Sequence, residues 1–323
     1  MDFRVDEDQQ ALQEGVRAFL EDRVSLEALP ELVKQGGIDR ALWRELAELG
    51  VFGLRLSEEQ GGVGLGYAEA VLIFAELGRR AVPGPLVWSH LAAGLIEGAA
   101  SGDVVVGGLD QTVPTNAPVL VEQLEGIDTL LVLRADGIRQ LDARSLQGEK
   151  VENPSDPLTP ISYVAELPAG EAIGDVAAVG RLRRDGAALV SGQLLGLAEA
   201  SLALAVAYSK GREQFNRPIG SFQALKHIMA DMYLRQEQAR AAAYAAGATL
   251  DDPEVGDPDR AVAVAKLICQ EAAHKNARAC IQIYGGMGFT WEMPPHYYLK
   301  RSWVLETFFG SAEEHAETLA AAI

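Results

Sequence analysis

Two short segments carry residue types that could bind a large anionic cofactor. The first is Gln282–Phe289, QIYGGMGF, which holds three glycines within four positions at the end of a helical pattern. Glycine lets a backbone approach a phosphate or a ring without interference from a Cβ atom. The second lies about seventy residues upstream, where Arg212, Phe215 and Gln223 occupy a loop that opens another helix. Because a guanidinium can bind phosphate with two parallel hydrogen bonds, these residues predict one half of a dinucleotide site.

Composition limits the classes of function. The 323 residues are 48% hydrophobic, which is enough for a sizeable buried core, and the net charge is −18. Such an acidic chain lacks the basic surface that nucleic acid requires, although local arginines can still bind a phosphate. The acidic start, residues 1–8, does not resemble a signal peptide, and no apolar run is long enough for a membrane span. We therefore expect a cytoplasmic protein with neither nucleic acid nor membrane as a partner.

The cysteines and histidines predict no metal site. Cys269 and Cys280 are eleven residues apart in one helical pattern, a separation of roughly 16 Å along a helix, so they cannot bridge within it. We expect buried free thiols. The histidines at positions 227, 274, 296 and 315 show no metal-ligand spacing with one another or with the cysteines.

The chain reads as three regions that would have to position these residues. Residues 1–100 and 181–323 carry apolar residues at helical spacing, whereas residues 101–180 contain short β-rich runs separated by turn residues. The predicted fold is mainly α with a small β domain: an N-terminal helical domain, a middle β domain and a C-terminal four-helix bundle. The expected helices span 6–20, 43–49, 67–77, 87–99, 187–210, 222–250 and 257–284, with another from 295. The expected strands span 103–107, 117–121, 129–133 and 137–141.

With its motifs in this order, the chain resembles the acyl-CoA dehydrogenase family over nearly its whole length. The resemblance rests on Trp43–Gly50 and Ser57–Gly64 in the first region and on Gly211–Gln223 and Gln282–Phe289 in the last. The last two segments keep the family's spacing and order, which makes them far more specific than an isolated Gly-Gly-x-Gly.

The resemblance implies flavin adenine dinucleotide (FAD) as the cofactor, held between subunits. Arg212 would contact the pyrophosphate, Phe215 would pack against the cofactor, and Gln223 would hydrogen-bond it. The backbone at Gln282, Gly285 and Gly286 would come close to the adenosine side.

The same resemblance leaves the general base without an obvious residue. In most of the family the base is a glutamate immediately before Gly-Thr or Gly-Ser near the C-terminus, and here Phe309 stands before Gly310-Ser311. A phenyl ring cannot accept a proton. In some members the base lies at the start of the first bundle helix, where this chain has Gly186, next to Asp185. Glu306 is a candidate base if it shares a helical face with position 309.

The middle region also departs from the family, because residues 101–181 lack the segments that hold the isoalloxazine ring. Two such losses predict the short, non-catalytic subunit of an α2β2 acyl-CoA dehydrogenase, of the kind found in actinobacterial steroid catabolism. A full-length sister subunit would supply the base. The substrate would be an acyl-CoA thioester, steroid-derived by resemblance, and the acceptor an electron-transfer flavoprotein.

Two alternatives remain open at this point. One is a self-sufficient homo-oligomeric acyl-CoA dehydrogenase that uses Glu306. The other is a redox-inactive scaffold that keeps the fold alone.

Overall fold

The computed structural model describes residues 4–115 and 117–321. Contacts within the chain define two compact units. Unit 1 comprises Met1–Leu29, Tyr67–Val82 and Ala188–Ile323, and unit 2 comprises Pro30–Gly66 and Pro83–Ala187. The predicted fold class is confirmed, because helices dominate both ends of the chain and strands β1 to β7 all fall between residues 106 and 174.

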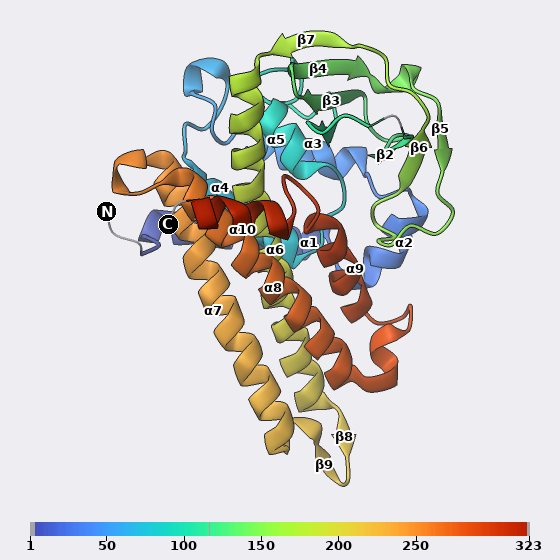
Figure 1. Ribbon diagram of the computed structural model, residues 1–323. Coiled ribbons are helices and arrows are strands. Elements are labelled where there is room, and N and C mark those ends of the chain that lie inside the picture. Colours follow the sequence, from blue (N-terminus) through green and yellow to red (C-terminus); the bar gives the residue numbers. More distant parts are fainter. Residues whose placement is uncertain (1–3, 116, 322–323) are drawn as a thin grey trace. The chain divides into compact units, whose positions relative to one another are not determined.

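Unit 1 is a helical bundle (Figure 1). Its long helices α6, α7 and α8 run side by side, and a small hairpin of β8 and β9 lies at the end where α6 leads into α7. The helices are α1 (Glu7–Arg23), α4 (Tyr67–Arg79), α6 (Val176–Gly211, which begins in unit 2), α7 (Gln223–Asp251), α8 (Pro258–Tyr284), α9 (Pro295–Leu305) and α10 (Ala312–Ala321).

Local signals explain where these helices begin. Asp257 caps α8 by accepting hydrogen bonds from the backbone N–H groups of Asp259 and Arg260, and Pro258 occupies the first turn. The expected start of α6 at residue 187 was too late. The helix begins at Val176, after Asp175 accepts a hydrogen bond from the N–H of Ala178 at 2.8 Å. The charged, glycine-containing stretch that follows obscures the apolar pattern of this first part.

Helices α4 and α6 cross with their backbones in contact, because glycines face the crossing on both sides. A Cβ atom at Gly196 would lie 1.9 Å from the carbonyl oxygen of Ala75, and one at Gly78 would lie 2.1 Å from that of Gln193. Only glycine fits at such distances. The crossing therefore depends on these two positions.

A buried network of charges joins α1, α4, α6 and α7. Glu76 is fully buried and accepts hydrogen bonds from Arg17 at 2.8 and 2.9 Å and from Arg79 at 3.1 Å. Arg79 also pairs with Glu199, which binds Arg240. Burial works to raise the pKa of Glu76, but the hydrogen bonds and charges of Arg17 and Arg79 outweigh it and hold the pKa below its ordinary value.

Unit 2 contains α2 (Leu29–Lys34), α3 (Arg40–Glu48), α5 (Leu86–Ala92) and two sheets. The first sheet has the order β1–β3–β4–β7, with β1 and β3 parallel and the other pairs antiparallel. The second has the order β2–β6–β5 and is antiparallel. The strands are β1 (Val106–Gln111), β2 (Val119–Glu122), β3 (Thr129–Arg134), β4 (Gly137–Asp142), β5 (Gly148–Lys150), β6 (Ile161–Val164) and β7 (Glu171–Gly174).

The sequence patterns missed β5, β6 and β7 and made α5 too long. The three strands have three or four residues each and expose much of their surface, so alternation gives little signal. They form because other strands pair with them: β7 pairs with β4, β6 pairs with β2, and β5 pairs with β6. Helix α5 ends at Ala92 instead of residue 99, and turns follow it.

Among the described residues, one helix, α6, is long and apolar enough to pass a test for membrane spans. Its most apolar stretch is 83% buried within the protein, as for the central helix of a bundle.

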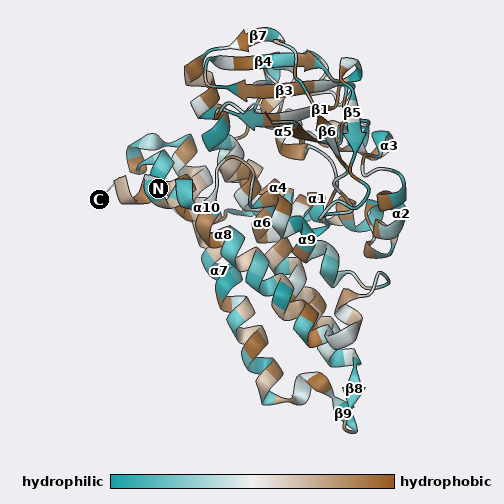
Figure 2. Cartoon of the chain, turned by 45° about the vertical axis from the view of Figure 1, so that its right-hand side comes forward, coloured by the Kyte–Doolittle hydropathy of each residue, from teal (hydrophilic) through white to brown (hydrophobic). Residues whose placement is uncertain are grey.

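Figure 2 shows that hydrophobic and hydrophilic residues alternate along its neighbour α7, which is the pattern of a helix with one face packed and one face in water.

Candidate cofactor site

The loop after α6 folds into a tight β-hairpin. Strands β8 (Glu213–Gln214) and β9 (Arg217–Pro218) pair, and the N–H of Ile219 donates to the carbonyl of Arg212 at 2.8 Å. The two turn residues, Phe215 and Asn216, have φ values of +55° and +59°. Two successive left-handed residues are typical of a type I′ turn. The sequence did not reveal this hairpin, because phenylalanine is an unusual first residue for such a turn.

The hairpin directs arginine and phenyl groups outward. Phe215 is 87% exposed and meets the ring of Phe222 edge-on at 6.0 Å. The guanidinium of Arg217 lies 4.0 Å from the centre of the Phe222 ring, a favourable cation–π arrangement. Arg212 is exposed at the base of the hairpin. Sequence reasoning overlooked Arg217, although a second arginine in the same short loop was a visible signal.

Gln223 is the first residue of α7 and is exposed. The residue before it, Phe222, provides no side-chain cap. The backbone N–H groups of a first turn have no partner within the helix. Together with the helix dipole, they make this end of α7 suitable for a negatively charged group.

The glycine segment, Gly285–Phe289, follows the end of α8. Its three glycines are needed for different reasons. Gly285 has a φ of +64°, and Gly288 could not carry a Cβ atom, which would lie 2.7 Å from the carbonyl oxygen of Ile281. At Gly286 neither reason applies, since a Cβ atom there would meet nothing within 4 Å. The side chain of Gln282 is exposed nearby along α8. None of the residues that the structure describes explains the glycine at 286, whereas close approach of an outside group would.

Both predicted motifs lie at one end of unit 1, where β8 and β9 appear in Figure 1. The rings of Tyr208 on α6 and Tyr284 on α8 stack at 3.9 Å. One apolar cluster joins residues next to both motifs, including Ile219, Leu225, Ile283 and Tyr284. The structure therefore brings the six predicted residues to the same end of the bundle. The guanidinium of Arg212 and the uncapped N–H groups of α7 can donate hydrogen bonds to phosphate, and Gly286 leaves room for a ligand beside the backbone. Together these groups fit a dinucleotide.

The predicted base position is occupied by a buried ring. Phe309 is 3% exposed and has a φ of +55°. The assumption that Glu306 shares a helical face with it is wrong, because α9 ends at Leu305 and Glu306 is only its C-cap. In unit 2, Gly186 is buried inside α6, and Asp185 lies 3.4 Å from the Nε of Arg184.

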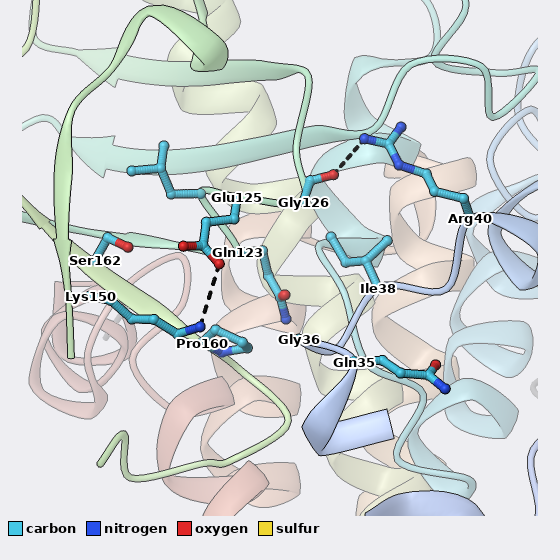
Figure 3. Close-up of a pocket in the computed structure, with 11 residues that line it drawn as sticks. Gln35, Gly36, Ile38, Arg40, Gln123, Glu125, Gly126, Lys150, Pro160 and Ser162 are labelled. Carbon is cyan, nitrogen blue, oxygen red and sulfur yellow. Dashed lines mark hydrogen bonds and ion pairs between the residues drawn. The ribbon is translucent and has the colours of Figure 1, made fainter. Parts of the chain in front are cut away.

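A separate cavity of about 370 Å³ lies in unit 2, and no predicted cofactor residue lines it (Figure 3). Its rim carries an ion pair of Lys150 and Glu125 at 3.4 Å, and Arg40 donates to the carbonyl of Gly126 at 2.7 Å. Gln123 is buried in its wall, and its Oε1 has no hydrogen-bond partner among the described residues. This polar cavity is large enough for ordered water.

The sequence and the fold of this chain are similar to those of known proteins. The family models for the N-terminal and C-terminal domains of acyl-CoA dehydrogenase match residues 6–102 and 181–323. Acyl-CoA dehydrogenase IpdE2 of Mycolicibacterium smegmatis is 31% identical over 98% of this chain and 99% of its own length.

Two solved structures share the whole fold. The ChsE4–ChsE5 complex from Mycobacterium tuberculosis superposes with a TM-score of 0.84 at 23% identity, covering 99% of this chain and 98% of the other. The Tcur3481–Tcur3483 steroid acyl-CoA dehydrogenase, in its G363A variant, gives 0.83 at 26% identity and covers 98% of both chains. With both terminal domains matched and a relative aligned from end to end, this chain belongs to the acyl-CoA dehydrogenase family.

Proposed function

We propose that this chain is the non-catalytic subunit of an FAD-dependent acyl-CoA dehydrogenase and completes an FAD site together with a sister subunit. The observation that carries the proposal is the contrast between two sites on one chain. The cofactor-facing motifs are present and exposed, whereas a buried phenyl ring stands where the family's base would be.

In this assignment each residue has a binding role. Arg212 binds the pyrophosphate, Phe215 packs against the cofactor, and Gln223 hydrogen-bonds it from the start of α7. The backbone at Gln282, Gly285 and Gly286 lies against the adenosine. FAD, when bound, accepts a hydride from the β-carbon of an acyl-CoA thioester. The α-proton has to be removed by a carboxylate, and the sister subunit supplies it.

Support for a sister subunit comes from the surface and from the comparisons. Large apolar side chains are exposed on unit 1, among them Phe215, Phe289 and Trp291 at 87%, 66% and 61%. Such surfaces are typical of protein interfaces. A similar fold was solved in the ChsE4–ChsE5 complex, and another in the Tcur3481–Tcur3483 steroid acyl-CoA dehydrogenase. The proposal therefore includes an α2β2 assembly, a steroid-derived CoA thioester, an electron-transfer flavoprotein as acceptor, and a cytoplasmic location.

Co-expression tests the division of roles. Purified alone, the chain should be colourless and should not reduce an artificial electron acceptor in the presence of acyl-CoA. Co-purified with a longer relative that keeps the glutamate, it should yield a yellow complex with about one FAD per heterodimer. An active, flavin-containing homo-oligomer of this chain alone would overturn the proposal. A complex with no flavin would instead favour a redox-inactive scaffold.

Arg212→Met tests the cofactor contact within that complex. Loss of a charge-assisted bidentate contact should weaken FAD binding by roughly 10-fold to 100-fold. Arg260→Met is the matched control, since Arg260 is exposed at the opposite end of α8. Retention is measured as bound flavin after gel filtration at increasing dilution. Equal retention in the two variants would remove Arg212 from the site.

The second candidate is a homo-oligomeric enzyme in which Glu306 acts as the base. Its carboxylate lies three residues before the base position, but α9 ends at Leu305, so the two positions share no helical face and the geometry gives this candidate less support. Glu306→Gln should then abolish reduction of bound flavin by substrate and leave flavin content unchanged. Unchanged reduction would dismiss this candidate.

A further inference from the structure

In the segment Glu306–Ser311, the N–H groups of Thr307 and Phe308 still donate to carbonyl groups of α9, but the carbonyl groups of the segment accept from side chains of other helices. Helix α9 ends just before it, and the last carbonyl groups of a helix have no partner within that helix. The carbonyl of Glu306 accepts a hydrogen bond from the Nζ of Lys266 at 2.9 Å, and the carbonyl of Gly310 lies 3.4 Å from the same atom. Lys266 comes from α8, some forty residues earlier in the chain.

The other side of the segment is fixed from α10. The Nε2 of His315 is 3.1 Å from the carbonyl oxygen of Phe309. The carboxylate of Glu314 accepts from the N–H of Ser311 at 2.8 Å, and the hydroxyl of Ser311 accepts from the N–H of Glu314 at 3.3 Å. This reciprocal pair is a capping box at the start of α10. The two ends of the segment are therefore anchored to different helices.

Between these anchors the backbone is strained. Phe309 has a φ of +55°, a left-handed conformation that costs a residue other than glycine roughly 1–2 kcal/mol. Gly310 follows with a φ of +109°, and a Cβ atom there would lie 2.9 Å from the Nε2 of His315. Without outside support, position 309 would relax to an ordinary backbone conformation and its side chain would turn.

We propose that Lys266 is a positioning residue that holds Glu306–Ser311 in this strained conformation and keeps the side chain at position 309 buried. This inference concerns the isolated chain, so it does not depend on FAD or on a sister subunit. Within the proposed function it would explain how the phenyl ring is kept in the position that the base takes in relatives.

The environment of Lys266 gives the proposal a pH signature. Its side chain is completely buried. Burial lowers the pKa of Lys266 to about 8, against the opposing influence of Glu306 just after α9, Cys269 on its own helix and Glu314 on α10. A lysine that reaches water when the segment opens would have its ordinary pKa of about 10.5. The open segment therefore binds more protons between pH 8 and pH 10.5, and the closed form gains stability as the pH rises through that range.

Hydrogen exchange of the isolated chain tests the proposal with Lys266→Met. The amides of residues 307–311 should exchange about 10-fold to 100-fold faster than in the unmodified chain, because the carbonyl groups of Glu306 and Gly310 lose their shared hydrogen-bond donor. Lys275→Met is the control, since Lys275 is exposed on the same helix and pairs with Glu271. Unchanged exchange in Lys266→Met, or an equal change in the control, would overturn the proposal.

A double-mutant cycle separates positioning from a general loss of packing. In a Phe309→Gly background the left-handed φ carries no strain. Lys266→Met should then accelerate exchange of the segment clearly less than it does with Phe309 present. Equal acceleration in the two backgrounds would show that the lysine does not hold the strained residue.

The unmodified chain offers a measurement that needs no variant. Millisecond labelling between pH 7.5 and pH 9.5, corrected for intrinsic exchange, should show protection of residues 307–311 rising about 20-fold. A flat profile would contradict opening coupled to Lys266 even if Lys266→Met fails to fold.

Discussion

At the scale of single residues, two glycines of the glycine segment differ in whether the packing of the chain requires them. Gly288 is required by the packing of the chain, since a Cβ atom would lie 2.7 Å from the carbonyl oxygen of Ile281. Gly286 is not, because the space beside it is open to 4 Å. Gly180 has the same open surroundings, so the expectation that a ligand comes close at Gly286 rests on its place in the predicted cofactor motif together with this open space.

The two glycines therefore predict opposite outcomes for the same substitution. Gly286→Ala should change the free energy of unfolding of the isolated chain by less than about 0.5 kcal/mol but weaken flavin retention in the complex. Gly288→Ala should destabilise the isolated chain by about 1–3 kcal/mol through the steric clash. Urea unfolding followed by circular dichroism gives the first quantity, and bound flavin gives the second. Normal flavin retention in Gly286→Ala would place the adenosine elsewhere.

At the scale of elements, the crossing of α4 and α6 is the tightest contact in the bundle of unit 1. Gly196→Ala should cost about 3 kcal/mol or more of unfolding free energy, because its Cβ atom would sit 1.9 Å from the carbonyl of Ala75. Gly180→Ala is the matched control on the same helix, where a Cβ atom would meet nothing within 4 Å. That variant should gain up to about 1 kcal/mol from helix propensity. Similar stabilities in the two variants would refute the close crossing.

In the charge network between α1, α4, α6 and α7, removing the charge of one residue should lower the free energy of unfolding by a large amount. Glu76→Gln should destabilise the chain by about 3 kcal/mol, since Arg17 and Arg79 would lose a fully buried partner. Arg79 would keep its pairing with Glu199. Glu31→Gln is a suitable control, because Glu31 forms an exposed pair with Lys34 and should change stability by under about 1 kcal/mol. Thermal unfolding of the three proteins provides the comparison.

At the scale of the whole molecule, two buried histidines predict acid lability. The Nδ1–H of His90 in unit 2 donates to the carbonyl oxygen of Val51 at 2.9 Å, and His296 in unit 1 packs among Trp291 and Tyr297. Burial lowers the pKa of each to about 4. The unfolded chain binds more protons than the folded chain between pH 6.5 and pH 4, so stability is present above pH 6.5 and is lost as the pH falls through that window.

His296→Phe provides the check on this prediction. Both ring nitrogens of His296 lack hydrogen-bond partners among the described residues, so a phenyl ring removes the titration without removing a bond. The loss of stability between pH 6.5 and pH 4 should shrink by about 3 kcal/mol. A pH profile parallel to that of the unmodified chain would show that His296 is not the group responsible.

The sequence by itself determined the fold class and the family, and it predicted the residues of the candidate cofactor site. Long alanine-rich helical patterns and the two specific motifs are local signals, and helical hydrogen bonding is local as well. Helices α7 and α8 have 29 and 27 residues. Two antiparallel helices of similar length return the chain to the level where it began, which brings Gln282 back towards Arg212. The free state of Cys269 and Cys280 was likewise fixed by their spacing on one helix and is confirmed.

Only the tertiary structure decided the features that depend on distant partners. Strands β5, β6 and β7 are too short to be recognised alone and exist because other strands pair with them. Glu306 and Phe309 do not share a helical face, because α9 ends at Leu305. In the segment after it, the carbonyl groups of Glu306 and Phe309 bond to Lys266 and His315 on other helices. Local propensity cannot encode a backbone conformation that long-range side-chain contacts impose.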